Sequence, residues 1–256
     1  MKLSEEMKNK TLLSFELFPP KTEKGLQNLP GTIDHLMKYN PSYISCTYGA
    51  GGGNVGANRE VCQMIKNAGT TPVTHFTVIK NTKEGIKEQL DQYLADGVDH
   101  MLALRGDIPL GETTTCGDFD YATDLVKFVR DTYGDKFEIA VAGSPEGHIS
   151  CRSLESDIAV LKQKQDNGAD YIMTQLCWDM EQFKYWLDAI REAGVTMPVD
   201  VGVMPILDMS ATINMALSRN GCVMDSELCR LISRNWLFPN PFAAKDADGK
   251  PFDMFY

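Results

Sequence analysis

Residues 14–21 read Ser-Phe-Glu-Leu-Phe-Pro-Pro-Lys, a short apolar segment with one carboxylate near its end. Its two prolines force an extended backbone and lack N–H donors, so the segment predicts a strand over Leu12–Leu17 that ends there. Glu16 then stands near the carboxyl end of the strand among apolar neighbours. Partial desolvation favours the protonated carboxyl, which suits Glu16 to donate a proton at neutral pH. A carboxylate in water, or one paired with a lysine, is the alternative interpretation.

Six further apolar runs of similar length follow along the chain. They lack polar alternation, which is typical of strands buried on both faces of a parallel sheet. The seven predicted strands are Leu12–Leu17, Tyr43–Thr47, Pro72–Val78, His100–Leu104, Glu138–Ala142, Tyr171–Gln175 and Val199–Met204. Helical periodicity separates them, over Leu26–Lys38, Arg59–Ala68, Lys83–Ala95, Tyr121–Tyr133, Leu154–Asn167 and Glu181–Ala193. A strand–helix unit that repeats about every 30 residues predicts a parallel sheet with helices outside.

Two features favour a (β/α)8 barrel of the TIM type over an open doubly wound sheet. The first strand is not followed by G-x-G-x-x-G, so the dinucleotide-binding fingerprint is missing. Polar residues also stand at the carboxyl end of nearly every strand, as barrel enzymes require. These residues are Glu16, Thr47, Tyr48, His75, Arg105, Asp107, Ser144 and Gln175.

The end of the chain does not complete the repeat. After the seventh strand the periodicity predicts helices over Met209–Asn220 and Asp225–Trp236, but no convincing eighth strand follows. The barrel is therefore expected to lack this strand or to be closed by something else, such as a partner. We expect a single barrel domain over residues 1–256, with a frayed leader over 1–10 and an irregular tail over 237–256.

Composition narrows the class of partner. The net charge of −10 argues against nucleic acid or an anionic membrane, since both reward clustered lysine and arginine. No apolar run approaches the roughly 20 residues of a membrane span, and the N-terminus has no secretory signal. The seven cysteines form no C-x-x-C pair and the four histidines no H-E-x-x-H, so we expect a cytoplasmic protein with free thiols and no metal.

Two further motifs stand at predicted strand ends. Residues 104–107 read Leu-Arg-Gly-Asp, where Gly106 allows a tight exit from the strand while Arg105 and Asp107 flank the mouth. A salt-bridged loop is the alternative. Residues 47–53 read Thr-Tyr-Gly-Ala-Gly-Gly-Gly, whose backbone N–H groups suit a phosphate or a pterin unless the loop is merely flexible.

Taken in order, these motifs resemble the methylenetetrahydrofolate reductase family. That family opens with S-F-E-[FL]-F-P-P-[KR], carries T-Y-G-A, L-R-G-D and P-E-x-H after later strands, and the resemblance runs from Ser14 to Pro205. It implies a barrel that binds FAD and reduces 5,10-methylenetetrahydrofolate to 5-methyltetrahydrofolate, with NADH or NADPH as reductant. Folate is then the substrate, and the expected partner is a second copy of the chain or an electron-donating subunit.

The resemblance also implies residue roles. Glu16 would be the general acid, Asp107 would stabilise a cationic iminium and tune the flavin, and Gln175 would orient the folate, so that all three bind substrate. The implied cofactor-binding residues are Thr47, Tyr48, Ala50, His75, Arg105, Gly106, Asp107, Tyr121, Ala122, His148, Asp157 and Lys164.

Four positions depart from the family pattern. Ser144 stands where an aromatic residue is usual, Val160 and Gln163 replace an asparagine and an arginine, and Ala211 replaces a glutamine of the substrate loop. Loss of an arginine near a pyrophosphate would weaken flavin binding. Two alternatives therefore remain: a degenerate or partner-dependent subunit that receives electrons from another protein, and a barrel lyase or aldolase without flavin. No lysine at a strand end supports the second.

Overall fold

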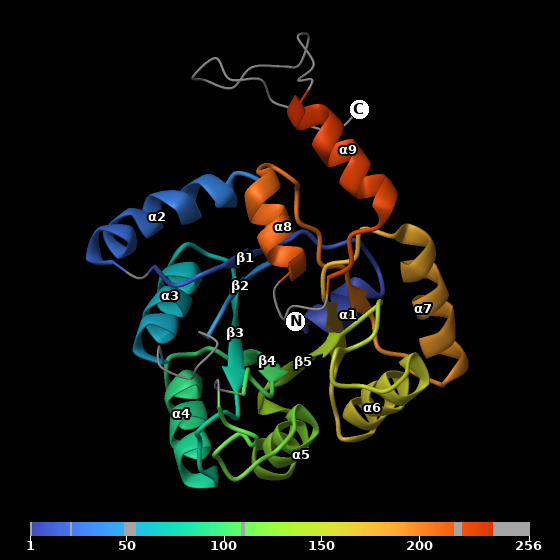
Figure 1. Ribbon diagram of the computed structural model, residues 1–256. Helices are drawn as coiled ribbons and strands as arrows, with labels where there is room; N and C mark the ends of the chain where they lie inside the picture. The colour runs from blue at the N-terminus through green and yellow to red at the C-terminus, as the bar shows by residue number, and fades with distance from the viewer. Residues whose placement is uncertain (1, 21, 49–54, 109–110, 218–221, 238–256) are drawn as a thin grey trace. The chain divides into compact units, whose positions relative to one another are not determined.

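A computed structural model describes residues 2–20, 22–48, 55–108, 111–217 and 222–237 (Figure 1). The chain divides into two compact units, each built from segments far apart in the sequence. The first comprises Met1–Ala142, Val160–Met173 and Val195–Asp200. The second comprises Gly143–Ala159, Thr174–Gly194 and Val201–Tyr256. A single barrel domain over residues 1–256 stays a prediction.

A parallel sheet of seven strands organises the first unit, with the strands in chain order from β1 to β7. The strands are β1 (Ser14–Leu17), β2 (Tyr43–Cys46), β3 (Thr71–Thr77), β4 (His100–Leu104), β5 (Glu138–Gly143), β6 (Tyr171–Thr174) and β7 (Val199–Asp200). Each matches its predicted run to within two residues at either end, except the seventh, which covers only the first two residues of its run. That strand ends early because the N–H of Gly202 donates to Oγ1 of Thr174 (2.9 Å), a side chain rather than a ladder carbonyl.

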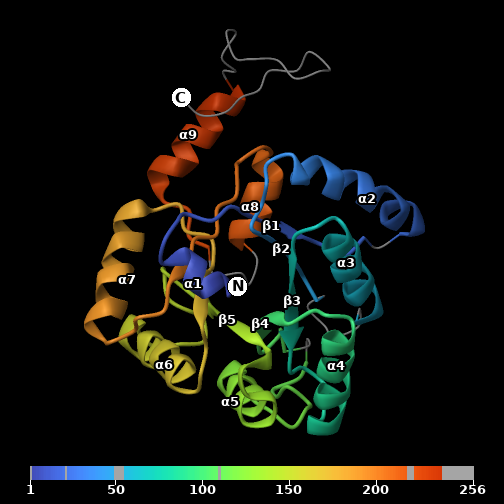
Figure 2. The ribbon, with the colours of Figure 1, turned by 180° about the vertical axis from the view of Figure 1, so that it is seen from behind.

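The predicted helices are also present. They are α2 (Glu23–Met37), α3 (Val55–Asn67), α4 (Lys83–Ala95), α5 (Ala122–Tyr133), α6 (Leu154–Asp166), α7 (Met180–Glu192), α8 (Met209–Leu217) and α9 (Ser226–Leu237), with a short 3-10 helix at Gly134–Lys136. Side-chain caps fix several starts, since Thr22 and Thr82 each accept a backbone N–H three residues on. In the first unit, α2 to α5 lie outside the strands, as Figures 1 and 2 show from opposite sides.

The interior of the first unit is a packed core. One buried side chain from each of β2 to β6, together with Leu3, forms a single cluster: Tyr43, Val73, Leu102, Ala140 and Tyr171. A sheet whose strands all send side chains to one shared interior is curled, as in a TIM-type barrel. The ends of the curl are linked through Asp200 of β7, which accepts hydrogen bonds from Ser14 of β1 (3.2 Å) and from the hydroxyl of Tyr43. The predicted barrel without an eighth strand is confirmed over the described residues.

The predicted frayed leader is wrong for residues 3–7. Leu3–Met7 form helix α1, and Leu3 is 2% exposed within the barrel core. The reason is a buried carboxylate: Glu138 of β5 accepts the backbone N–H groups of Leu3 (2.7 Å) and Ser4 (2.8 Å), so the first turn is capped from inside the sheet. The predicted tail lies outside the described residues beyond Leu237. Across the part of the chain that is described, no helix has the length and apolar character of a membrane span.

Candidate functional site

Glu16 lies near the carboxyl end of β1, two residues after Ser14 and on the same face of the strand. Its side chain keeps 45% of its surface exposed, so water reaches one side of the carboxyl. The protein atoms around the other side desolvate it and raise its pKa above the usual glutamate value. The raised pKa that the sequence predicts is therefore present, and the role of Glu16 as an acid stays a prediction.

His75 of β3 is the ionisable neighbour of Glu16. Its Nε2 atom lies 3.6 Å from Oε2 of Glu16, and the residue is only 7% exposed. Burial lowers the pKa of His75 to about 4, so the imidazole is neutral at neutral pH. The contact is therefore a neutral imidazole beside a carboxyl group with a raised pKa, and not an ion pair.

Three buried polar atoms near these strand ends have no hydrogen-bond partner among the described residues. They are Oγ of Ser45, Nε2 of His75 and Oγ1 of Thr77. Ser45 lies directly opposite Glu16 in the β1–β2 register, and His75 and Thr77 alternate along the same face of β3. Buried polar groups are normally hydrogen-bonded. Their unused hydrogen-bonding capacity leaves this face available to a ligand or to ordered water.

The Leu-Arg-Gly-Asp loop leaves β4 through a glycine that cannot be replaced without strain. Gly106 has φ +86°, and a Cβ atom there would lie 3.1 Å from Cβ of Thr77 and 3.2 Å from Cβ of Ile79. Arg105 is half-buried and Asp107 is exposed. Neither forms an ion pair with a described residue, so the salt-bridged loop finds no support there.

The Thr-Tyr-Gly-Ala loop is described only as far as Tyr48, so Ala50 lies outside the described residues. Thr47 is half-buried. Tyr48 is 2% exposed, packs on Phe76 with ring centroids 5.5 Å apart, and donates its hydroxyl to Gln89 (2.5 Å). The Tyr48 ring is therefore part of the core, and its backbone is what remains to contact a ligand.

Asn58 of α3 supports this loop, and the sequence analysis missed it. Its Nδ2 donates to the carbonyls of Cys46 (3.0 Å) and Thr47 (3.1 Å), while its Oδ1 accepts from Thr74 (2.8 Å) and Tyr93 (2.6 Å). Asn58 is completely buried. A fully satisfied buried amide fixes where β2 ends. The available signal was an asparagine on the side of α3 that faces the sheet.

Three more predicted residues lie in the first unit. Tyr121 is 61% exposed and precedes α5, where its N–H donates to Asp124 (2.9 Å), and Ala122 is the first residue of that helix. Lys164 of α6 donates through Nζ to the carbonyl of Ala142 near the end of β5 (2.9 Å). Lys164 thus places a cation beside a strand end.

The other predicted residues belong to the second unit. The N–H of His148 donates to Asp157 (3.1 Å), so the structure brings these two together. Gln175 follows β6, where its N–H donates to Gly143 (2.8 Å) and its side-chain Oε1 accepts from the N–H of Leu176 (2.9 Å). A joint site of these residues with Glu16 stays a prediction.

The second unit also contains a cavity of about 480 Å³. Its lining residues are Glu146, Trp178, Asp179, Gln182, Val223, Asp225, Glu227, Leu228 and Leu231. Glu146 accepts the N–H of Val223 (2.7 Å), and burial raises its pKa. Nε1 of Trp178 is buried without a described partner. Trp178 therefore borders a cavity with an unused hydrogen-bond donor.

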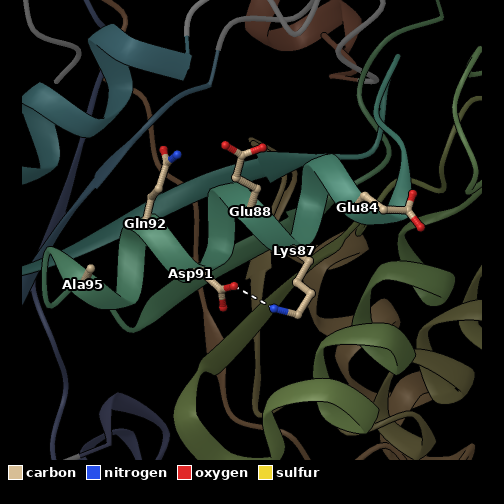
Figure 3. Close-up of a pocket in the computed structure, with 6 residues that line it drawn as sticks. All are labelled: Glu84, Lys87, Glu88, Asp91, Gln92 and Ala95. Carbon is tan, nitrogen blue, oxygen red and sulfur yellow. Dashed lines mark hydrogen bonds and ion pairs between the residues drawn. The ribbon is translucent and has the colours of Figure 1, made fainter.

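A second hollow, shown in Figure 3, lies on the outer face of α4. All of its lining residues come from that one helix: Glu84, Lys87, Glu88, Asp91, Gln92 and Ala95. Lys87 and Asp91 form an exposed ion pair (2.7 Å) one helical turn apart. No strand-end residue reaches it, so this hollow is a solvated helix face and not a candidate site.

The sequence family can be assigned from a comparison over most of the chain. A family model described as methylenetetrahydrofolate reductase matches residues 2–228. The chain belongs to this family. Within the reductase family, it is 37% identical over 219 residues to "Methylenetetrahydrofolate reductase (NADH) 1" of Arabidopsis thaliana, which covers 80% of this chain and 37% of that protein.

It is also 33% identical over 202 residues to the 5,10-methylenetetrahydrofolate reductase of Escherichia coli strain K12, covering 78% of this chain and 67% of that protein. The chain thus spans little more than a third of the length of its plant relative. Among solved structures, a Clostridium thermocellum protein described as binding two copies of 5-methyl-5,6,7,8-tetrahydrofolic acid superposes with a TM-score of 0.65. That likeness, at 15% identity over 91% of this chain and 79% of the other, supports the fold alone.

Proposed function

We propose that this chain reduces 5,10-methylenetetrahydrofolate to 5-methyltetrahydrofolate with a hydride from FAD. The observation that carries the proposal is Glu16, a half-exposed carboxyl with a raised pKa at the end of the first barrel strand, beside a neutral His75. A raised pKa favours the protonated carboxyl, which is the form that can donate a proton. Because the chain belongs to the reductase family, we propose that a nitrogen atom of folate accepts this proton.

The first unit offers groups that fit a polar cofactor. Buried Ser45, His75 and Thr77 have unused hydrogen-bonding atoms, and Gly106 keeps the backbone of its loop free of a side chain. We propose that these strand ends hold FAD, together with Thr47, Tyr48, Arg105, Tyr121, Ala122 and Lys164 of the first unit. FAD, when bound, supplies the hydride after reduction by NADH or NADPH.

In the proposed reaction, residues of this chain donate the proton and stabilise the positive charge that develops on the substrate. Glu16 donates its proton to the folate ring nitrogen that leaves the bridging carbon, and the N–C bond electrons stay on that nitrogen. The bridging carbon becomes a cationic iminium, whose charge the exposed carboxylate of Asp107 offsets. Gln175 orients the folate through its amide. Hydride addition to the iminium carbon completes the methyl group.

The visible absorption spectrum of the purified protein tests the proposal, recorded with added FAD and then with NADH or NADPH in the absence of oxygen. We expect a flavin spectrum that bleaches with the nicotinamide and returns when methylenetetrahydrofolate is added, with methyltetrahydrofolate as the product. A protein that binds no flavin even in excess FAD would overturn the proposal.

A different pattern would indicate the partner-dependent subunit. In that case flavin binds and persists with either nicotinamide, but a chemical reductant bleaches it and folate then reoxidises it. The substitutions at Ser144, Val160 and Gln163 motivate this outcome. The folate half of the reaction would still belong to this chain, and the direct use of a nicotinamide would not.

A further inference from the structure

We infer that His75 is a positioning residue for Glu16, and that it accepts a hydrogen bond from the protonated carboxyl and holds the proton where substrate can take it. This inference rests on the proposed function, since it assigns the state of the proposed acid. It adds to the cofactor contact expected of His75 a role that acts through Glu16.

The geometry limits which partner can move. His75 lies between Thr74 and Phe76, both completely buried, so its ring is fixed within β3. The Glu16 side chain is 45% exposed, so it is less confined than that of His75. The Nε2–Oε2 separation of 3.6 Å is too long for a hydrogen bond in the present arrangement. A side-chain rotation that closes it by less than about 1 Å makes the bond.

The Nε2 atom of the buried imidazole has no other partner among the described residues. Nε2 of His75 lacks a hydrogen-bond partner among the described residues, and leaving such an atom unpaired is costly. Glu16 is the acidic side chain within reach of that nitrogen. A protonated carboxyl supplies the donor that a neutral nitrogen without hydrogen requires.

The charges around the pair favour the neutral form of both groups. Burial lowers the pKa of His75 to about 4 and raises that of Glu16. From β2, Tyr43 and Ser45 lie on the same face of the sheet as Glu16, and the pKa of Tyr43 is raised by burial, so its hydroxyl is neutral at neutral pH. Asp200 of β7 accepts a hydrogen bond from the hydroxyl of Tyr43. A cation in place of His75 would instead stabilise the carboxylate and remove the proton.

The proton balance of the step is simple. The Glu16 O–H bond breaks as the folate nitrogen takes the proton, and the bond electrons stay on the carboxylate. The new carboxylate loses its hydrogen bond to neutral His75, since that nitrogen carries no hydrogen to donate. Water at the exposed side of Glu16 returns the proton, and the hydrogen bond to His75 re-forms.

The test measures the pKa of Glu16 by carbon NMR of glutamate-labelled, flavin-free protein, with the Glu16 signal assigned by its loss in Glu16→Gln. We expect His75→Phe to lower this pKa by about 0.5–1 unit, because the bond to the protonated form is gone. His75→Gln, whose amide oxygen accepts a hydrogen bond, is expected to restore part of the shift. His35→Phe removes an exposed imidazole of α2 and is the matched control with no expected change.

An unchanged or raised pKa of Glu16 in folded His75→Phe would overturn the inference. Should that variant fail to fold, His75→Leu offers the same comparison, since leucine also cannot accept a hydrogen bond. This measurement needs neither flavin nor turnover, so it stands even if the proposed reductase activity fails.

A double-mutant cycle measured by kinetics distinguishes a role of His75 in positioning Glu16 from a role in packing alone. We expect His75→Phe to slow folate reduction in the natural background and to have no further effect in the Glu16→Gln background, as residues that act through one another are non-additive. Equal losses in both backgrounds would mean that His75 acts only through flavin binding or stability. FAD affinity, measured in parallel, reports any separate effect on the cofactor.

Discussion

The reactivity of Glu16 depends on two details of its surroundings at the residue scale. One side of the carboxyl is desolvated, which raises its pKa, and the other remains open to water, which allows the carboxyl to exchange its proton with solvent. In the proposed mechanism, this exchange returns the proton after each turnover. A fully buried carboxyl would hold its proton but could not exchange it readily. Half-exposure therefore suits a group that must give and regain a proton.

Glu16→Gln is expected to lower the rate of methylenetetrahydrofolate reduction by about 10²–10⁴-fold, since glutamine cannot supply the proton. Flavin reduction by the nicotinamide does not use this proton and should persist, so stopped-flow measurement of the two half-reactions checks the prediction. The control is Glu84→Gln on the outer face of α4, which should change neither half-reaction. Full folate turnover in Glu16→Gln would remove Glu16 from the mechanism.

The backbone angle and the close neighbours of Gly106 predict that a larger residue there destabilises the fold, again at the scale of a single residue. Gly106→Ala should destabilise the fold by about 1–3 kcal/mol, because φ is +86° and the new Cβ crowds Thr77 and Ile79. Gly69→Ala, with φ +95° but open space, isolates the cost of the backbone angle at about 1 kcal/mol. Gly31→Ala lies in α2 with neither constraint and should stabilise by about 0.5–1 kcal/mol. Urea denaturation of the three variants gives the ranking, and equal effects at Gly106 and Gly69 would show that crowding is unimportant.

At the scale of elements, helix α1 is held by Glu138, a buried carboxylate that also pairs with His100. Glu138 caps the helix and contacts Nε2 of His100 (3.0 Å), while Nδ1 of His100 contacts Asp99 (2.7 Å). Burial opposes both charges, but the hydrogen bonds outweigh it. The pKa of Glu138 is lowered to about 2 and that of His100 is raised to about 9. The attachment of α1 therefore depends on pH in two directions.

The pKa shifts of Glu138 and His100 have opposite signs, so together they define a pH range in which α1 is held most firmly. The contribution of Glu138 is present above its unfolded pKa of about 4.3 and is lost as pH falls toward 2. The contribution of His100 is present below its unfolded pKa of about 6.5 and is lost as pH rises through 9. We expect the free energy of unfolding to be highest between these limits, measured by urea denaturation across that range.

Glu138→Gln tests whether Glu138 and His100 cause this pH dependence of stability. We expect it to flatten the acid side of the profile and, by removing a partner of His100, to reduce the loss on the alkaline side. Protection of the Leu3 and Ser4 amides from hydrogen exchange should fall in the same variant. A variant with the original profile and full protection would show that α1 is held by packing of Leu3 alone.

At the scale of the whole molecule, side-chain hydrogen bonds close the first unit. The described strands run from β1 to β7 without an eighth, and Asp200 links the two ends through Ser14 and Tyr43. Burial and Asp200 both raise the pKa of Tyr43, so its hydroxyl keeps the hydrogen that it donates. Hydrogen bonds here take the place that a paired strand has in a complete barrel.

Asp200→Ala should therefore destabilise the first unit by about 1–3 kcal/mol, because two partly buried donors lose their acceptor. Asp200→Asn retains an acceptor oxygen and should cost less. The control is Asp131→Ala, which breaks only an exposed ion pair with Lys127 and should change stability by less than about 1 kcal/mol. Thermal unfolding of the three variants measures the difference, and a loss no larger at Asp200 than at Asp131 would mean that the link is dispensable.

Periodicity predicted the strands and helices closely because it reflects which faces are buried. The run at His100–Leu104 and the helix at Lys83–Ala95 match the structure residue for residue. The buried cap of α1 could not be predicted, since Glu138 is 135 residues from Leu3 in the sequence. Asn58 was missed for the same reason, as its partners come from β2, β3 and α4.

The sequence by itself determined the order of the strands, the family, and the strand ends at which polar residues gather, because local periodicity and short motifs encode these. Only the tertiary structure decided that Glu16 meets His75, that Asp200 bridges β7 and β1, and that Tyr48 turns into the core. Contacts and pKa values of this kind depend on distances between residues remote in sequence and on the water that packing excludes. No local pattern of residues carries either quantity.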